Sequence, residues 1–556
     1  MSIAARTARP QVREQGWENL AFAAFLALIG LGALLWTTGE ISGWIATGHR
    51  PGADFVTMGK ALTRLFGTWQ EPKMAWPREV RVNMSGPWLF YATFVVLLVL
   101  VAAVAMALRR VFSGVFGSVR SSAWATLSDL RHLIVNGVQP ARLILGRVRG
   151  RLIAAEERQS VIVLGPTQSM KTSGFAIPAI LEWEGPVVAT SVKSDLLRHT
   201  IEIRRQKGDV WVYDPTRSVQ EEPATWTPLA TCHTWHGAQK TASWLTGATT
   251  SASTGLSDAD FWYAAAAKLL APLLYAAARA DLTIADVVRW VNLQEQKEVL
   301  AALKGAEQAA IDAASASFAR EGRQKSSVYT TAETVLAAYE DPIVSVSAEG
   351  CDISPRRLLA GSGTTLYVVA PSHEQRRLRP LFETLLHTVI SYAFERANEQ
   401  GGPLDPPLLL VLDEAANIAP LRDLDALAST AASHGIQLVS VFQDLAQVRT
   451  RYGDRGLTVA NNHRGKVILS GISDTQTLEY ASRLLGDEEV LQASVTRGVH
   501  GDRSTTESTA LRTVAPANVL RAIRPGEGIL VYGHLPPARL TLRPWFKEKR
   551  SLSRGS

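Results

Sequence analysis

Two long stretches of the chain are apolar and contain no charged residue. The first covers residues 20–36 and the second residues 88–108. A helix rises about 1.5 Å per residue, so each stretch can cross a hydrocarbon layer of about 30 Å, the first with a small contribution from its flanks. The sequence therefore predicts transmembrane helices over residues 19–39 and 88–108.

A cleaved signal peptide is the alternative explanation for the first stretch. Such a peptide ends in a pattern of small residues that a peptidase recognises. The first stretch ends in Leu35-Trp36-Thr37-Thr38 instead, and a second apolar stretch follows it. We therefore favour a membrane anchor that stays on the protein.

Basic residues near the helix ends predict which ends lie in the cytoplasm. The loop between the helices, residues 40–87, has no Lys or Arg immediately beside either helix. Arginines flank the other two ends: Arg6, Arg9 and Arg13 before the first helix, and Arg109, Arg110 and Arg120 after the second. We expect a multi-pass protein of the inner (plasma) membrane, with residues 1–18 and the chain after residue 108 in the cytoplasm.

After the second helix the pattern changes twice. Residues 109–155 carry many arginines, which favours a basic juxtamembrane linker near anionic lipid over a DNA site. Short apolar runs then alternate with helical stretches, and this alternation indicates an α/β fold with a parallel sheet covered on both faces. The runs are residues 160–164, 186–190, 210–213, 364–370, 408–412, 436–442, 467–470 and 529–532.

The alternation is interrupted once, over residues 248–346. This part is rich in alanine and charge and contains no convincing strand. It predicts an all-α domain inserted into one α/β domain, whose two parts are residues 156–247 and 347–546. A basic tail, residues 547–556, ends the chain.

Composition narrows the class of protein only a little further. Apolar residues make up 46% and charged residues 20% of the 556, as in a folded protein. The two cysteines exclude a disulfide framework and a Cys-rich zinc site. The net charge of +7 permits contact with nucleic acid or anionic lipid without establishing either.

The stretch GPTQSMKTSG, residues 165–174, resembles a phosphate-binding loop. Such a loop has the pattern G-x-x-x-x-G-K-[ST], in which backbone N–H groups cradle phosphates, the lysine reaches the β and γ phosphates and the hydroxyl binds Mg²⁺. The spacing is right, but Met170 stands where the second glycine is expected. We predict that ATP is bound by Gly165, Pro166, Thr167, Gln168, Ser169, Met170, Lys171 and Thr172, with Thr172 also a ligand of Mg²⁺.

Met170 leaves two interpretations of this loop open. In a helical or near-helical conformation its side chain would point away from the phosphates, and the loop would work with modified packing. Alternatively, the loop would bind nucleotide but hydrolyse it slowly.

Polar residues end two later apolar runs. Asp413 and Glu414 follow the run 408–412, and Gln443 follows the run 436–442. Ligands of open α/β sheets bind at the carboxyl ends of the strands. We expect Asp413 to hold Mg²⁺ through water, Glu414 to polarise the attacking water, and Gln443 to sense the γ-phosphate or orient water. The predicted catalytic residues are Glu414, Lys171 and Gln443.

With these motifs in place, the sequence resembles the membrane-anchored coupling ATPases of type IV secretion and conjugation, of the TraG/TraD kind. The resemblance runs from the two apolar helices almost to the C-terminus. Its further motifs are Trp226-Thr227-Pro228-Leu229, Phe261-Trp262, Leu366-Tyr367-Val368-Val369-Ala370-Pro371-Ser372, Leu378-Arg379-Pro380-Leu381, Gly465-Lys466-Val467-Ile468-Leu469, Val531-Tyr532-Gly533 and Pro536-Pro537-Ala538.

The resemblance implies a RecA-like P-loop ATPase with an inserted all-α domain. Proteins of this family form homo-hexameric rings at the cytoplasmic mouth of a type IV secretion channel. They recruit a relaxase bound to single-stranded DNA, or a secreted protein effector, and use ATP to drive export. The Walker A residues of the family map onto Gly165, Lys171 and Thr172, its Walker B pair onto Asp413 and Glu414, and its downstream glutamine onto Gln443.

Three departures from the family pattern stand out. Many relatives have glycine at Gln168 and Met170. Residues 191–196 differ from the Asp-x-Lys-Gly-Glu of many relatives, although Lys193 is kept. Residues 431–435 lack the arginine that often reaches a neighbour's phosphate, and Arg449, Arg451 and Arg464 are substitutes only by proximity in the sequence.

Two other functions compete with this one. The first is a DNA-translocating ATPase of the FtsK/HerA type that serves chromosome or plasmid partition, and the helical insertion argues against it. For a ring motor of either kind we expect single- or double-stranded DNA as a partner. The second is a membrane docking platform that binds nucleotide without turnover.

Overall fold

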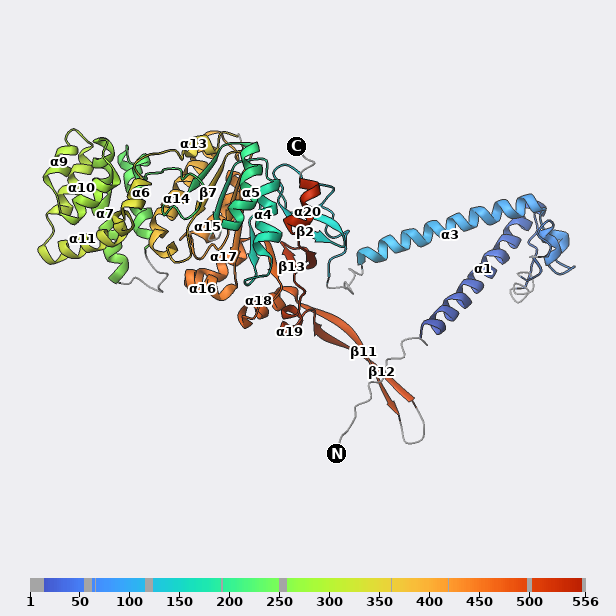
Figure 1. Cartoon of the computed structure of the whole chain (residues 1–556). Coiled ribbons are helices and arrows are strands. Elements are labelled where there is room, and N and C mark those ends of the chain that lie inside the picture. The colour runs from blue at the N-terminus through green and yellow to red at the C-terminus, as the bar shows by residue number, and fades with distance from the viewer. Residues whose placement is uncertain are drawn as a thin grey trace, which may run out of the picture. The chain divides into compact units, whose positions relative to one another are not determined.

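The structure is a computed structural model that describes residues 15–54, 63–65, 67–115, 124–191, 194–249, 258–361, 363–418, 420–497 and 503–552. The chain divides into two compact units, Met1–Arg120 and Ser121–Ser556 (Figure 1).

The N-terminal unit consists of two long helices and a folded connection. Helix α1 (Gln15–Thr47) and helix α3 (Pro87–Val115) are joined by a segment with two short helical turns, η2 (Pro72–Ala75) and η3 (Arg81–Asn83). Ser85 Oγ donates to Ser42 Oγ at 2.9 Å, which joins the start of α3 to α1. A small apolar cluster of Ala53, Ala75, Trp76 and Met84 packs beside them.

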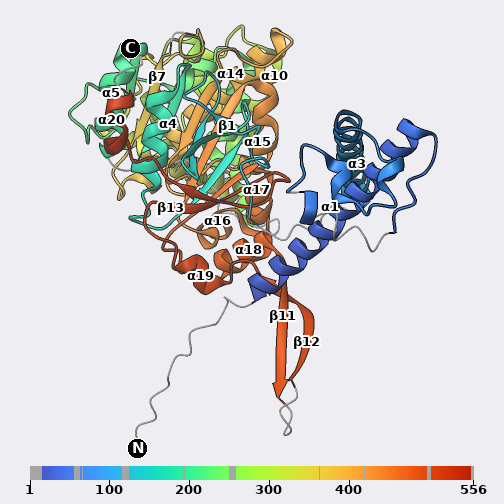
Figure 2. The same cartoon turned by 90° about the vertical axis from the view of Figure 1, so that its right-hand side faces the viewer.

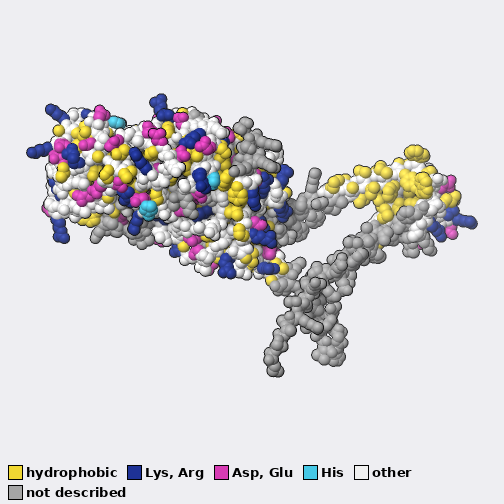
Figure 3. All heavy atoms as spheres, in the orientation of Figure 1, with side chains coloured by type: hydrophobic (Ala, Val, Ile, Leu, Met, Phe, Trp, Pro, Cys, Tyr) yellow, Lys and Arg dark blue, Asp and Glu magenta, His cyan; other side chains and the backbone are white. Residues whose placement is uncertain are grey.

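One helix of this unit can cross a membrane by length and composition. The segment Pro87–Val104 of α3 has a mean hydropathy of 2.4 and is only 6% buried, and Figure 3 shows apolar side chains along it. Residues 19–28 of the other predicted span lie outside the residues whose side chains are described, so a second crossing stays a prediction. A further apolar helical segment, Asp260–Arg279, is 67% buried within the C-terminal unit, as a core helix is.

A 12-stranded sheet organises the C-terminal unit. Seven of its strands run parallel in the order β6-β7-β5-β8-β9-β4-β10. All eight predicted runs coincide with strands, which confirms the α/β prediction. Seven of them form the parallel part of the sheet, whereas β13 pairs with β10 in antiparallel fashion, so the sheet is mixed. The strands are β4 (Val161–Leu164), β5 (Val187–Ser191), β6 (Val210–Tyr213), β7 (Thr365–Val369), β8 (Leu408–Leu412), β9 (Ile436–Phe442), β10 (Gly465–Leu469) and β13 (Glu527–Tyr532).

Both faces of the sheet are buried. Alternate residues of a strand point to opposite faces, and in β4 they join separate clusters: Ile162 belongs to one, and Val163 to the other. Helices α4 (Ile177–Glu182) and α5 (Ser194–Lys207) pack against the second cluster, and α14 (Gln375–Glu399) against the first (Figures 1 and 2). This two-sided burial explains why these strands are apolar throughout.

The linker predicted over residues 109–155 is wrong from Trp124 onward. Strands β1 (Ile134–Val135), β2 (Ile144–Val148), β3 (Arg151–Ala154) and β14 (Ala538–Thr541) extend the sheet in antiparallel fashion beyond β13. Arg142 is structural, since its Nε donates to Ala155 O at 2.9 Å. These edge strands are short and alternate with arginines, so they lack the continuous apolar runs of the central strands.

Two C-terminal features of the fold were also not predicted from the sequence. Strands β11 (Asp487–Arg497) and β12 (Arg503–Thr513) form a separate two-stranded sheet, visible as a long hairpin in Figure 2. The basic tail begins inside helix α20 (Trp545–Leu552). Both segments consist mainly of polar residues, so they have no apolar periodicity from which a strand or helix could be predicted.

All described residues between β6 and β7 form helices or connections. The longest helices are α6 (Trp235–Gly247), α7 (Asp258–Arg279), α10 (Gln308–Phe318) and α11 (Gly322–Leu336). Their buried side chains join the apolar cluster that covers one face of the sheet. The division of this region into a separate all-α domain stays a prediction.

The burial of His463 predicts that the folded protein becomes less stable in acid. Its Nδ1 lies 2.7 Å from Val459 O and its Nε2 lies 3.0 Å from Ser440 Oγ in β9, so the neutral ring donates to the carbonyl and accepts from the hydroxyl. Burial lowers the pKa of His463 from 6.5 to about 4. The stability that the neutral ring contributes is therefore complete above pH 6.5 and lost as the pH falls through about 4.

We expect His463→Gln to reduce this acid dependence, because glutamine has no proton to gain in this range. The measurement is the thermal unfolding midpoint of both proteins at about pH 7 and about pH 4. Between these two pH values, the shifted pKa of His463 lowers the free energy of unfolding of the parent protein by about 3 kcal/mol. An equal fall of the midpoint in both proteins would contradict the assignment.

Candidate nucleotide-binding site

The carboxyl ends of β4, β9, β8 and β5 meet at one edge of the sheet, because these neighbouring strands are parallel. The loop after β4 begins there, and the Gly165 N–H donates to Phe442 O at the end of β9 at 3.0 Å. A Cβ at Gly165 would collide with Ser169 Oγ and approach Leu469. Glycine is therefore required where the loop leaves the strand.

Two residues of the loop adopt the left-handed backbone conformation. Gln168 has a φ of +68° and Met170 a φ of +66°. The expected helical or near-helical conformation of Met170 is therefore wrong. Left-handed backbone costs a residue with a side chain about 1–2 kcal/mol, which explains why glycine is usual at such positions.

The Met170 side chain is half-buried and packs on the apolar cluster beneath the loop. A Cβ placed on Gly526, in the turn before β13, would lie 3.6 Å from Met170 Sδ. The next residue, Lys171, already has helical φ and ψ, and a π-helical turn, η4 (Thr172–Ala176), leads into α4. The loop reverses at Met170 and enters the helix directly.

Lys171, Thr172 and Asp413 lie together, with Lys171 and Asp413 buried and Thr172 half-buried. Thr172 Oγ1 donates to Asp413 Oδ2 at 3.0 Å, although the two residues are far apart in the sequence. Asp413 is 5% and Lys171 7% exposed. Among the described residues, neither Lys171 Nζ nor Asp413 Oδ1 has a hydrogen-bond partner.

Burial raises the pKa of Asp413 to about 6, against the opposing effects of the Thr172 hydrogen bond and the Lys171 charge. Glu414 follows with a φ of +53°, a third position with left-handed backbone, and its Oε2 accepts from Asn417 Nδ2 at 3.1 Å. Strain of this kind is found where function requires an exact geometry.

A cavity of about 250 Å³ joins these groups. Its size suits the phosphates of a nucleotide and a cation better than a whole nucleotide, since sites for whole ligands are usually about 300 Å³ or larger. Its lining residues are Thr167, Gln168, Met170, Lys171, Thr172, Ser173, Asp195, Asp413 and Glu414.

Asp195 was missed by sequence reasoning. It lies in the first turn of α5, just after β5, and so reaches the same edge of the sheet. Its position after a parallel strand was the available signal. Lys193, which the family pattern pointed to, lies outside the described residues.

Three predicted loop residues and Gln443 are not part of the cavity lining. Gly165, Pro166 and Ser169 shape the start of the loop instead. Gln443 is half-buried next to Phe442, and its backbone N–H donates to Gln447 Oε1 at 2.9 Å. It shares the edge of the sheet without lining the cavity.

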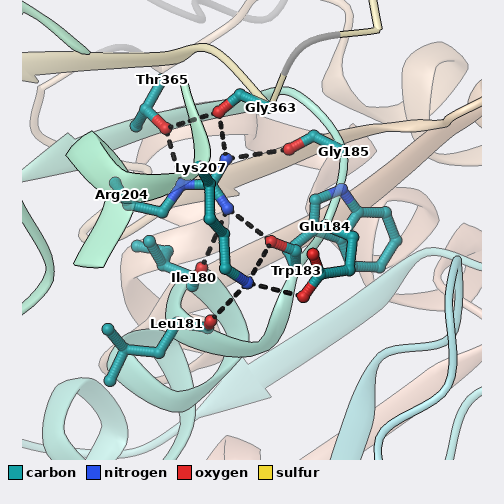
Figure 4. A network of polar contacts seen from close by, with 9 residues as sticks. All are labelled: Ile180, Leu181, Trp183, Glu184, Gly185, Arg204, Lys207, Gly363 and Thr365. Carbon is teal, nitrogen blue, oxygen red and sulfur yellow. Dashed lines mark hydrogen bonds and ion pairs between the residues drawn. The ribbon is translucent and has the colours of Figure 1, made fainter. Parts of the chain in front are cut away.

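The C-terminal end of α4 is held by two cations of α5 (Figure 4). Arg204 is fully buried, and its Nη1 donates to Trp183 O and, at 3.5 Å, to Ile180 O. Lys207 Nζ donates to Leu181 O at 2.9 Å and to Glu184 Oε1 at 2.7 Å. The carbonyls at a helix end have no partner within the helix, so these side chains supply it.

Arg204 also ties this helix end to the neighbouring loops. Its Nε donates to Thr365 Oγ1 at 2.7 Å, and its Nη2 to Gly185 O at 2.9 Å and Gly363 O at 2.6 Å. Burial lowers the pKa of Arg204 to about 10.

A buried ion pair joins α4 to the C-terminal segment. Arg543 donates to both carboxylate oxygens of Glu182, at 3.0 and 2.7 Å. The Arg543 backbone N–H donates to Gly174 O in the turn after the loop at 3.4 Å. The helix that carries Thr172 is thus fixed along its length.

The residues at this edge fit a magnesium ion and phosphates. Mg²⁺ prefers oxygen ligands, and Thr172 Oγ1 and the unpartnered Asp413 Oδ1 supply them. The buried ammonium of Lys171, which has no partner among the described residues, suits a phosphate oxygen. The fold and this loop define a RecA-like α/β protein of the P-loop class.

The chain belongs to the family described as "Type IV secretory system Conjugative DNA transfer", whose model matches residues 123–555. One relative is the conjugal transfer protein TraG of Escherichia coli, 25% identical over 367 residues that cover 61% of this chain and 56% of TraG. The chain thus spans little more than half of that relative.

Solved structures show the same fold. The bacterial conjugative coupling protein TrwBdeltaN70, in an unbound form, matches with a TM-score of 0.58 and 18% identity, covering 75% of this chain and 92% of the other. The plasmid coupling protein TrwB in complex with ADP and Mg²⁺ matches with a TM-score of 0.56 and 18% identity, covering 76% and 93%.

The left-handed backbone of Met170 predicts an unusual order of stabilities. Met170→Gly should give a more stable protein than Met170→Ala, by about 1 kcal/mol, because both lose the packing but only alanine keeps the strain. Thermal unfolding of the two variants measures the difference.

The matched control is Thr330, an exposed residue within α11. There alanine should be more stable than glycine, by about 1 kcal/mol, as is usual in a helix. The same order at both positions would contradict the left-handed assignment.

Proposed function

We propose that the chain is the membrane-anchored coupling ATPase of a type IV secretion or conjugation channel. The observation that carries the proposal is that the buried Lys171 and Asp413 lie together with Thr172 at the edge of a RecA-like sheet. Membership of the conjugative DNA transfer family supports it. The ADP and Mg²⁺ bound to TrwB, which has the same fold, support ATP and Mg²⁺ as ligands.

Each group of the site has a role in this proposal. Lys171 holds the β and γ phosphates, and Thr172 and Asp413 hold Mg²⁺. The bound metal would neutralise charge that develops on the phosphates. Glu414 polarises the attacking water, and Gln443 orients water or senses the γ-phosphate from the neighbouring strand.

Asp195 adds a third carboxylate to the cavity, beside Asp413 and Glu414. Lys171 is the one cation among the described residues that line it. A triphosphate requires more positive charge than one ammonium, so a bound cation and a basic residue of a neighbouring subunit complete the site. We therefore infer that copies of the chain assemble side by side, as the homo-hexameric ring that the family resemblance implies.

The remaining parts of the proposal concern location and cargo. Two N-terminal helices anchor the chain in the inner membrane, with the ATPase domain in the cytoplasm. Residues 248–346 form an all-α domain that recognises a relaxase–DNA complex or a protein effector. ATP hydrolysis drives the transfer of that cargo into the channel.

Two substitutions separate binding from turnover. Lys171→Ala removes a charge-assisted contact to the phosphates and should abolish both nucleotide binding and hydrolysis. Glu414→Gln keeps the shape but removes the charge that polarises water, so ATP should still bind while turnover falls by about a hundredfold or more. The measurements are nucleotide affinity, ATP turnover and conjugative transfer by the full chain.

Lys297→Ala is the matched control, since Lys297 is exposed on the helix α9 (Lys297–Ala302), outside the cavity. It should leave binding and turnover unchanged. The proposed function fails if Lys171→Ala and Glu414→Gln both hydrolyse ATP and transfer cargo like the parent protein.

A further inference from the structure

A second cavity lies at the antiparallel end of the sheet. It has a volume of about 780 Å³ and is formed by β2, β13, β14, Trp124 and helix α19 (Ala517–Arg521). Its lining includes Arg149, Arg524 and Arg539 and a set of aliphatic side chains, among them Val519, Leu520 and Ile529. We call it the arginine groove.

The three arginines of the groove have no ion-pair partner among the described residues. Arg149, Arg524 and Arg539 are exposed, and Glu527 is the one carboxylate among the described residues that line the groove. Two other arginines of the same unit are different, because Arg543 and Arg451 face the carboxylates of Glu182 and Glu383. An excess of guanidinium groups around one cavity attracts an anion, and guanidinium binds phosphate through two parallel hydrogen bonds.

The groove is also amphipathic. The Arg539 guanidinium lies over the Trp124 ring, 5.0 Å from its centroid. Trp124 is half-buried, and the aliphatic residues Val519, Leu520 and Ile529 line the same cavity. Tryptophan and arginine together are typical of the headgroup level of a membrane, where one part of the ligand is apolar and the other charged.

The sequence places this groove after the membrane anchor. Trp124 follows the apolar segment Pro87–Val104 closely along the chain, and Arg109, Arg110 and Arg120 lie between them. The Ala125 N–H donates to Pro537 O at 2.8 Å, which fixes the incoming chain beside β14. Basic residues next to a membrane helix are attracted to anionic lipid.

From this geometry we infer that the arginine groove binds the headgroup of an anionic phospholipid. Arg149, Arg524 and Arg539 hold the phosphate, and the aliphatic residues of the lining accept the first part of the acyl chains. The inference rests on the proposed membrane anchoring, but the binding itself is measured without nucleotide.

The groove is joined to the nucleotide loop by one turn. Arg524 and Glu527 line the groove, and Gly526 lies between them in the sequence. A Cβ placed on Gly526 would lie 3.6 Å from Sδ of Met170, the residue before Lys171. The Leu542 N–H donates to Gly526 O at 2.8 Å and so holds this turn. Lipid in the groove therefore stabilises the turn against which the strained Met170 packs, and anionic lipid should raise ATP turnover.

The direct test is a titration of the detergent-solubilised full chain with short-chain phosphatidylglycerol, followed by native mass spectrometry. Phosphatidylcholine of the same chain length serves as the zwitterionic control. We expect saturable binding of phosphatidylglycerol, weakened about tenfold or more in Arg524→Gln/Arg539→Gln, or by about 1.4 kcal/mol or more. Arg323→Gln, at an exposed position of α11 without an ion pair among the described residues, should bind like the parent protein.

The inference is overturned if the double variant binds phosphatidylglycerol like the parent protein, or if phosphatidylcholine binds equally well. It is also overturned if inorganic phosphate or a single-stranded oligonucleotide displaces the lipid with comparable affinity, because the groove would then be a site for free phosphate or nucleic acid. The single variant Arg524→Gln repeats the titration should the double variant fail to fold.

Lys171→Ala distinguishes this inference from the proposed function. That variant should bind phosphatidylglycerol normally while it fails to hydrolyse ATP. In lipid nanodiscs, phosphatidylglycerol should raise the turnover of the parent protein above that in phosphatidylcholine, and the double variant should show equal turnover in both. A lipid effect that persists in the double variant would contradict the coupling through Gly526.

Discussion

The buried guanidinium of Arg204 is the contact on which the geometry of the nucleotide site depends. The helical run that carries Thr172, residues 172–182, is shorter than the about 12–15 residues that an isolated helix needs in water. Its end carbonyls are buried, and Arg204 and Lys207 bind them (Figure 4). Each unpartnered buried carbonyl would cost about 1–3 kcal/mol, so without these cations the helix would not hold its position.

Because this helix is fixed, the site can contain groups that destabilise the folded protein. Asp413 is a buried carboxylate, and Met170 and Glu414 have left-handed backbone. All three raise the free energy of the folded protein, and all three line the same cavity. The Arg204 network and the Glu182–Arg543 pair offset this cost from outside the cavity.

The central strands and the main residues of the site could be predicted from the sequence. Strands buried on both faces are continuous apolar runs, and the residues that follow them must meet at one edge of a parallel sheet. Asp413 was found in this way, and Lys171 and Thr172 were found from the spacing of the phosphate-binding loop. The edge strands β1 to β3 were missed because they are short and contain Arg147 and Arg151, so their sequence suggested a linker.

Other features depend on contacts that no local pattern contains. The left-handed Met170 follows from the reversal of the loop and from its packing against Gly526, a residue distant in the sequence. Asp195 enters the cavity because β5 lies next to β8, which the order of strands along the chain does not reveal. The hairpin β11–β12 is largely polar and has no apolar periodicity.

The central claim is that Lys171, Thr172 and Asp413 form a site for a magnesium nucleotide. Thermal unfolding of the full chain with ADP, in the presence of Mg²⁺ or of a chelator, tests it most directly. A ligand at a hundred times its Kd stabilises the folded state by about 2.7 kcal/mol. The account predicts a rise of the unfolding midpoint with ADP and Mg²⁺ that shrinks with the chelator and disappears in Lys171→Ala. An unchanged midpoint in the parent protein, or an equal rise in Lys171→Ala, would contradict it.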